Sequence, residues 1–199
     1  FQKLLDNCKK YNCKKIILLS TMDVYGEITT NKIKEDYVGK KVKTYGKSKK
    51  HMEIMLKNFC KKNRINGVVF RLPGVIGKNS KHNFLSNLLI KLFKGENLKI
   101  SNPKLKFNNL IHVQNLCILA EKTFNQNGFH IFNVGSKYPI YLLNIVRFLK
   151  SKIKNSESKI IILKKKNKGF SVNINKILKH KYKIFSTKKS LGLFVKENV

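Results

Sequence analysis

The chain has 199 residues, of which 42% are hydrophobic, and it carries a formal net charge of +33 at pH 7. This composition excludes disorder along the whole chain and suits one domain, or one domain with a small lobe. The longest apolar runs, such as residues 16–19, are far too short to span a bilayer, so we expect a cytoplasmic protein that does not enter the membrane.

Short apolar runs alternate with amphipathic stretches along the first half of the chain. The predicted elements there are a helix near residues 4–8, a strand at 15–20, a helix at 44–62, a strand at 67–71 and a helix at 83–94. Steps of three and four residues predict that the 44–62 helix has one face made of Tyr45, Ser48, Met52, Met55 and Phe59. Gly95 is the natural stop of the 83–94 helix.

The second half continues the same alternation. Its predicted elements are a strand at 110–113, a helix at 114–124, a strand at 129–134, a helix at 140–153, a strand at 160–163 and weaker helices near 173–180 and 188–196. Short strands between longer helices predict an α/β fold, a partial doubly wound, Rossmann-like parallel sheet with a small C-terminal substrate lobe. We expect a sheet domain at 1–136, with a lobe insertion near 78–106, and a substrate-binding lobe at 137–199.

Tyr45 and Lys49 stand four residues apart at the start of the 44–62 helix. That spacing places both side chains on one face, within reach of a common ligand. A free phenol has a pKa of about 10, and a nearby ammonium lowers the pKa of a phenol. The pair can therefore accept a proton from a sugar hydroxyl as hydride leaves the same carbon. A lysine-rich chain also produces Y-x-x-x-K by chance, so by itself the spacing leaves a structural role open.

The hydroxyl residues Ser20 and Thr21 lie at the end of the strand predicted at 15–20. A turn that closes with Tyr25 and Gly26 follows them. In an open parallel sheet, substrates bind beyond the carboxyl ends of the strands, where these hydroxyls would emerge. A hydroxyl at that place can donate a hydrogen bond to the reacting oxygen. The alternative role for Thr21 is to cap the strand end.

Five segments, in this order, resemble the extended short-chain dehydrogenase/reductase family in its nucleotide-sugar epimerase and dehydratase branch. They are residues 20–26, 45–49, 71–77 (RLPGVIG), 109–113 (NLIHV) and 132–136 (FNVGS). The resemblance implies NAD or NADP as cofactor and a nucleotide-sugar substrate. It also implies epimerisation, dehydration or reduction of that sugar for surface polysaccharide synthesis, and pairing of two copies as a homodimer.

The resemblance also implies roles for individual residues, with no metal ligand among them. The implied catalytic residues are Thr21, Tyr45 and Lys49; the implied cofactor-binding residues are Ser20, Tyr45, Lys49 and Pro73; the implied substrate-binding residues are Thr21, Asp23, Gly74 and Asn108. In this scheme Lys49 binds the nicotinamide ribose and Pro73 lies against the nicotinamide.

Three departures from the family pattern refine this expectation. No G-x-x-G-x-x-G follows a strand, so we expect the N-terminal dinucleotide-binding segment to be missing from this sequence and the isolated chain to hold NAD(P) weakly. Asn108 and Asn109 replace an Arg-Asp pair that contacts substrate phosphate, with Lys106 as a substitute cation. Sugar 4,6-dehydratases have an Asp-Glu pair directly after the catalytic threonine. Here Met22 occupies the first of those two places and only Asp23 stands near the second, which favours epimerase or reductase over dehydratase.

The net charge leaves one alternative of a different class, a basic nucleic-acid-binding protein. Only Arg64, Arg71 and Arg147 are arginines among the 43 basic residues, whereas nucleic-acid surfaces favour arginine for bidentate and stacking contacts. Lysine, asparagine and isoleucine, all with A/T-rich codons, are abundant throughout, so a biased genome explains the charge at least as well. A second alternative is a non-catalytic remnant that keeps the fold and binds no cofactor.

The remaining polar features are expected to be structural. His112 lies mid-strand and is expected to be a packed, hydrogen-bonded core residue, whereas His51 is expected to face solvent. The lysine run at 164–168 predicts a charged surface loop. The four cysteines form no CxxC pair and have no histidine at zinc spacing, which favours reduced, mostly buried thiols.

Overall fold

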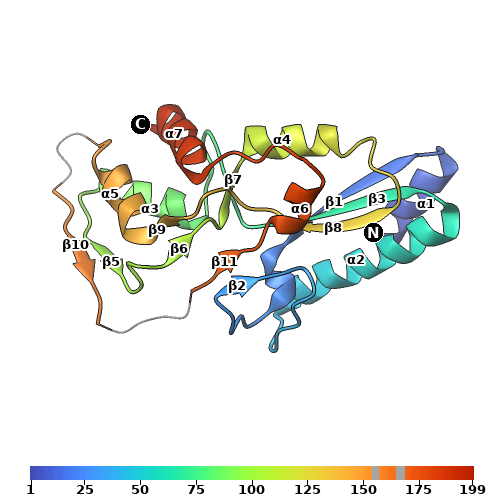
Figure 1. Ribbon diagram of the computed structural model, residues 1–199, viewed down its shortest axis with the longest axis horizontal. Helices are drawn as coiled ribbons and strands as arrows, with labels where there is room; N and C mark the ends of the chain where they lie inside the picture. The colour runs from blue at the N-terminus through green and yellow to red at the C-terminus, as the bar shows by residue number, and fades with distance from the viewer. Residues whose placement is uncertain (154–156, 165–168) are drawn as a thin grey trace.

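A three-stranded parallel sheet forms one end of an elongated molecule (Figure 1). This computed structural model describes residues 1–153, 157–164 and 169–199. The strands are β1 (Lys15–Thr21), β3 (Asn66–Leu72) and β8 (Phe129–Asn133), in the order β1-β3-β8. The predicted α/β fold with a parallel sheet is confirmed.

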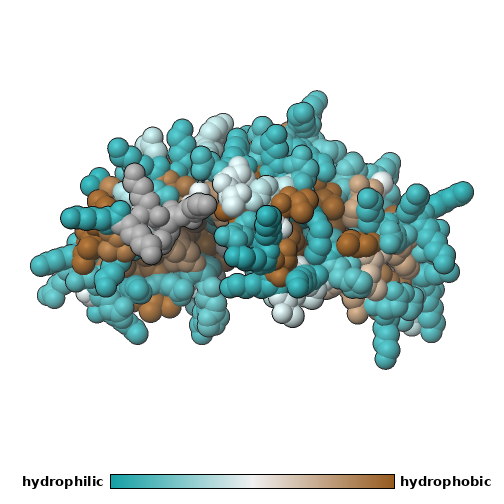
Figure 2. Space-filling model, turned by 90° about the horizontal axis from the view of Figure 1, so that it is seen from below, coloured by the Kyte–Doolittle hydropathy of each residue, from teal (hydrophilic) through white to brown (hydrophobic). Residues whose placement is uncertain are grey.

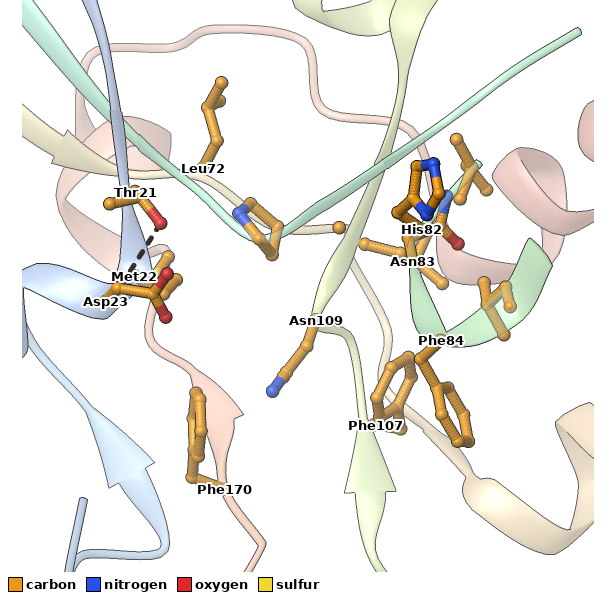
Figure 3. Close-up of a pocket in the computed structure, with 15 residues that line it drawn as sticks. Thr21, Met22, Asp23, Leu72, His82, Asn83, Phe84, Phe107, Asn109 and Phe170 are labelled. Atoms are coloured by element: carbon orange, nitrogen blue, oxygen red, sulfur yellow. Dashed lines mark hydrogen bonds between the residues drawn. The ribbon is translucent and has the colours of Figure 1, made fainter. Parts of the chain in front are cut away.

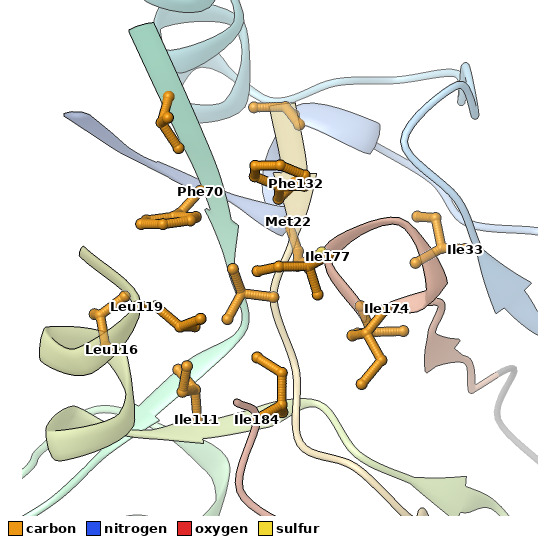
Figure 4. Close-up of a cluster of buried hydrophobic side chains, with 14 of the residues drawn as sticks. Met22, Ile33, Phe70, Ile111, Leu116, Leu119, Phe132, Ile174, Ile177 and Ile184 are labelled. Carbon is orange, nitrogen blue, oxygen red and sulfur yellow. The ribbon is translucent and has the colours of Figure 1, made fainter. Parts of the chain in front are cut away.

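Helices cover both faces of this sheet (Figure 1). One face is covered by α1 (Gln2–Lys10) and α2 (Thr44–Asn63), and the other by α4 (Val113–Lys122) and α6 (Asn175–Lys179). Successive residues of a strand point to opposite faces, so Val69 packs toward α2 while Phe70 packs toward α4 (Figure 4). Burial on both faces explains why β3 is apolar almost without interruption.

The opposite end of the molecule is built from short strands and three helices. The helices are α3 (Phe84–Phe93), α5 (Leu142–Lys150) and α7 (Thr187–Asn198). The strand pairs are β5 (Leu98–Ile100) with β10 (Ile160–Ile162), parallel, and β6 (Lys106–Phe107) with β9 (Ile140–Tyr141), antiparallel. Their apolar side chains share one core, separate from the cores on the sheet.

Smaller elements connect the two ends. They are the 3₁₀ helix η1 (Met22–Tyr25), the parallel pair β2 (Lys32–Ile33) and β11 (Ser171–Val172), and the parallel pair β4 (Gly74–Ile76) and β7 (Leu110–His112). Apolar residues between 170 and 184 pack on the sheet rather than on the far core. The division into a sheet domain at 1–136, with a lobe insertion near 78–106, and a substrate-binding lobe at 137–199 stays a prediction.

The surface shows how the many lysines are accommodated. Hydrophilic side chains are spread over the length of the face in Figure 2, with hydrophobic residues between them. The loop predicted at 164–168 falls mostly on residues outside those described. Within the described ranges, no helix combines the length and apolar character that a membrane span requires.

The predicted face of α2 is only partly buried: Met52, Met55 and Phe59 pack against the core, but the fully buried residues lie beside them. These are Gly46, Glu53, Leu56 and Cys60, whereas Tyr45 is 56% exposed. Glu53 takes a central place among the fully buried residues because a cation is buried opposite it, so the buried face is rotated by one residue, or about 100°.

That cation is Arg71 on β3, which is only 1% exposed. Its Nη2 donates to Oε2 of Glu53 at 2.7 Å, its Nε donates to Oε1 at 3.1 Å, and its Nη1 donates to the hydroxyl of Tyr25 at 2.8 Å. Burial opposes the charged guanidinium, but the bonds and charges of Glu53 and Tyr25 outweigh it and raise the pKa of Arg71. Burial also raises the pKa of Tyr25 to about 12.

Two helical glycines should respond to alanine in opposite directions. A Cβ on Gly46 would lie 2.2 Å from the backbone oxygen of Asp23, whereas nothing lies within 4 Å of one on Gly192 in α7. Gly192→Ala should stabilise by about 0.5–1 kcal/mol through helix propensity. Gly46→Ala should destabilise by about 1–3 kcal/mol, because α2 must move away from η1. Urea unfolding measures both, and equal stabilisation would contradict the close contact between α2 and η1.

Candidate active site

A cavity of about 410 Å³ opens at the carboxyl ends of β1 and β3 (Figure 3). One side of it is formed by residues 21–23, at the end of β1, and by residues 72–74, at the end of β3. Asn83, Phe84 and Phe107 lie on the opposite side. Its position is that of ligand sites in parallel α/β sheets, and its volume suits a small molecule.

The side of the cavity away from the sheet combines aromatic rings with the amides of Asn83 and Asn109. The rings of Phe84 and Phe107 lie 5.7 Å apart, and Phe170 lines the same space. Asn109 points into the cavity between these rings and Asp23 (Figure 3). Its Oδ1 is buried and has no hydrogen-bond partner among the described residues. Aromatic faces beside an amide suit a planar ligand with polar groups at its edge.

Thr21 and Asp23 form the polar side nearest the sheet. The Oγ1 of Thr21 accepts a hydrogen bond from the backbone N–H of Asp23 at 3.2 Å and caps η1. The Thr21 hydroxyl acts as an acceptor in this bond, so its hydrogen can be donated to a ligand. Asp23 also lines a second cavity of about 500 Å³, together with Lys43 and Tyr45.

Lys49 reaches the end of β1 from the first turns of α2. Its Nζ donates to the backbone oxygen of Leu19 at 3.0 Å, two residues before Thr21. Tyr45, one helical turn earlier, lines the second cavity and not the first. The structure therefore brings Thr21, Asp23 and the 73–74 turn into one cavity, and Tyr45 into the neighbouring cavity that shares Asp23.

Three of the predicted site residues line neither cavity: Lys49, which binds the Leu19 oxygen, and the buried residues Ser20 and Asn108. Ser20 is 5% exposed, and its hydroxyl donates to Oε1 of Glu53 at 2.6 Å. Asn108 is 2% exposed; its Nδ2 donates to the backbone oxygen of Val172 at 2.9 Å, and its Oδ1 accepts from the Val172 N–H at 2.8 Å. Both side chains satisfy buried groups and are turned away from ligand space.

Asn109 takes the place in the cavity that was expected for Asn108. Adjacent residues in extended backbone point to opposite sides, so only one of two neighbouring asparagines can face the cavity. The neighbouring strand does not show which of the two it is, because Leu110, Ile111 and His112 are all buried and give no alternating pattern.

His112 is a packed, hydrogen-bonded core residue, as predicted. It is 0% exposed, its Nδ1 accepts from the Gln114 N–H at 3.3 Å, and its Nε2 lies 3.2 Å from Oε2 of Glu197. His51 is exposed, also as predicted. The expectation of mostly buried thiols is wrong, because of the four cysteines only Cys60 is buried.

Known proteins resemble this chain in sequence and in fold. The model of the NAD dependent epimerase/dehydratase family matches residues 1–135. D-erythronate dehydrogenase of Haemophilus influenzae is 26% identical in an alignment 149 residues long. The match covers 65% of this chain and 47% of that protein. The chain therefore spans about half the length of this curated relative.

Solved structures of sugar-nucleotide epimerases share the fold. UDP-glucose 4-epimerase of Thermotoga maritima with UDP-glucose is 19% identical, with a TM-score of 0.77 over 98% of this chain and 66% of its own. UDP-glucuronic acid 4-epimerase of Bacillus cereus in complex with NAD is 22% identical, with a TM-score of 0.76 over 98% of this chain and 65% of its own.

The family match includes the whole sheet and the residues at its carboxyl edge. It extends over 135 of the 199 residues and contains Thr21, Tyr45, Lys49 and Pro73. The chain belongs to the NAD dependent epimerase/dehydratase family.

Proposed function

We propose that this chain carries the catalytic residues of an NAD(P)-dependent epimerase or reductase that acts on a nucleotide-activated sugar. The main support is the place of Lys49, whose ammonium lies 3.0 Å from the Leu19 oxygen at the carboxyl end of β1. Tyr45 stands one turn away on the same helix, and Thr21 lies at the same strand end. A phenol, an ammonium and a hydroxyl on these two elements support the proposal, because parallel sheets bind their ligands at the carboxyl ends of their strands.

The residues around Lys49 fit the nicotinamide riboside of NAD or NADP. An ammonium has three donors, and Leu19 takes one, so two remain for ribose hydroxyls. Pro73 lines the first cavity and offers an apolar ring to a flat ligand. When bound, the dinucleotide supplies the hydride acceptor for the sugar carbon.

The pyrophosphate end of the cofactor requires chain beyond these residues. Among the described strands, β1 pairs only with β3, and Leu19 on β1 is 46% exposed. The second edge of β1 and part of one sheet face are therefore open to a further strand and helix. We propose that a glycine-rich dinucleotide-binding segment placed ahead of Phe1 completes the site, as the greater length of the relatives also suggests.

Each polar residue has a definite part in the proposed reaction. Tyr45 takes the proton of the sugar hydroxyl as hydride leaves the same carbon, and it returns a proton when the carbonyl is reduced again. The ammonium of Lys49 stabilises the negative charge that develops on the phenol oxygen. Thr21 donates a hydrogen bond to the reacting sugar oxygen, and the aromatic side of the cavity, with Asn109, receives the nucleotide base.

Cofactor binding tests the role of Lys49. In protein that carries a dinucleotide-binding segment ahead of Phe1, Lys49→Met should weaken NADH binding about 10- to 100-fold, the cost of lost charged hydrogen bonds. Lys47→Met, an exposed lysine of the same helix, is the matched control and should leave the affinity unchanged. Fluorescence titration with NADH measures both. Equal affinities for the two variants would contradict the proposed cofactor site, and no NADH binding by the parent protein would indicate a non-catalytic remnant.

A further inference from the structure

Cys8 and Cys13 are joined by the way in which α1 ends. The C-cap is Tyr11, and Asn12 has a left-handed φ of 52°. The Cys13 N–H donates to the backbone oxygen of Cys8 at 2.8 Å, and the Asn12 N–H donates to that of Lys9 at 3.1 Å. These two bonds form a Schellman motif, in which the side chains of the two outer bonded residues commonly touch.

In this chain both of those outer residues are cysteines. Burial raises the pKa of the Cys8 thiol, and the neighbouring Cys13 thiol raises it further. Both residues are half-buried, so reagents can reach them. A disulfide needs Cα atoms roughly 4.4–6.8 Å apart with side chains that face each other. The backbone hydrogen bond holds the two residues side by side, and the Schellman motif brings their side chains toward each other, which is the arrangement that a disulfide needs.

The other two cysteines are in different surroundings. Cys60 is buried, and burial raises its pKa to about 11, which disfavours the reactive thiolate. Cys117 is exposed on α4. Of the four cysteines, which all lie in the described part of the chain, only Cys8 and Cys13 are joined to each other by a backbone hydrogen bond.

We propose that Cys8 and Cys13 form a reversible disulfide that closes the end of α1. With glutathione disulfide as oxidant, one cysteine thiolate attacks a glutathione sulfur and releases one glutathione thiolate. The second cysteine thiolate then attacks the mixed disulfide and releases the other. Two cysteine thiols are oxidised to one disulfide, the glutathione disulfide is reduced to two thiols, and these take up the two protons.

The bond would tie the last turn of α1 to the start of β1. Leu5 of α1 packs with Leu56 of α2 in the core on that face of the sheet, and β1 ends at Thr21. The oxidised protein should therefore melt a few degrees higher than the reduced protein, because the bridge restricts the unfolded chain.

Trypsin and mass spectrometry give a direct test on the full chain. Cleavage after Lys9 and Lys10 separates Cys8, in the peptide of residues 4–9, from Cys13, in the peptide of residues 11–14. After treatment with glutathione disulfide and alkylation of free thiols, the two peptides should appear joined, two hydrogens lighter than their sum, and should separate on reduction. If both peptides are recovered alkylated or glutathionylated while Cys117 has been oxidised, the proposal is overturned.

Two variants complete the test. Cys117→Ser should keep the joined peptides and the redox-dependent shift in melting temperature. Cys13→Ser should lose both and leave Cys8 as a thiol or a mixed disulfide with glutathione. Joined peptides between Cys8 and Cys117 in the parent protein would also overturn the pairing. The peptide result on the parent chain does not depend on whether Cys13→Ser folds.

Discussion

Tyr45→Phe should lower turnover by a factor of about 10² to 10⁴, the usual contribution of a positioned acid/base. The change removes one oxygen from a side chain that is 56% exposed, so it should leave folding intact. Sugar-nucleotide turnover, assayed in protein that carries a dinucleotide-binding segment ahead of Phe1, measures the effect.

Two controls separate a catalytic loss from a general one. Tyr138→Phe removes the same oxygen from a tyrosine that is 73% exposed and lines neither cavity, so turnover should not change. NADH affinity should persist in Tyr45→Phe, because Lys49 is retained. Near-normal turnover by Tyr45→Phe would exclude Tyr45 as the acid/base.

Glu53→Ala should lower the free energy of unfolding by about 3–5 kcal/mol, because it leaves the guanidinium of Arg71 buried without its carboxylate. Both side chains of this ion pair are 2% exposed, so water cannot replace the lost partner. That loss is a large part of the 5–15 kcal/mol that holds a typical domain folded. Urea unfolding at neutral pH measures it.

A surface pair is the matched control for the buried pair. Glu27 lies 3.8 Å from Lys41, and their side chains are 56% and 84% exposed. Glu27→Ala should change the free energy of unfolding by no more than about 0.5 kcal/mol, because solvent already screens that pair. Identical urea midpoints for the Glu53 and Glu27 variants would show that the carboxylate of Glu53 is not buried against Arg71.

A double variant separates the lost charge from the lost packing. Glu53→Leu with Arg71→Leu removes both charges and should be more stable than Glu53→Leu alone. The recovery should be incomplete, because Tyr25 and Ser20 also lose hydrogen-bond partners. Glu53 lies one turn after Lys49 on α2, so we also expect the single variant to lower turnover by loosening that helix.

Local pattern predicted those parts of the molecule that local forces build. The helix predicted at 83–94 forms as α3, where the Asn83 side chain accepts from the Ser86 N–H at 2.9 Å and Gly95 takes a φ of 69°. Caps and periodicity lie within a few residues of one another, so a sequence displays them directly. The helix predicted at 140–153 instead begins at Leu142, because Ile140 and Tyr141 pair with β6 as strand β9.

By itself, the sequence determined the alternation of short strands and helices that is typical of a parallel α/β fold, and the Tyr45–Lys49 spacing on a helix. Both are patterns among neighbours in the chain. Only the tertiary structure decided which face of α2 is buried and that Asn109, rather than Asn108, enters the cavity. The physical reason is distance along the chain. A buried carboxylate is stable only beside a cation from another element, and Glu53 finds Arg71 18 residues away on β3. Asn108 is likewise held by the backbone of Val172, 64 residues later, and no local pattern carries either pairing.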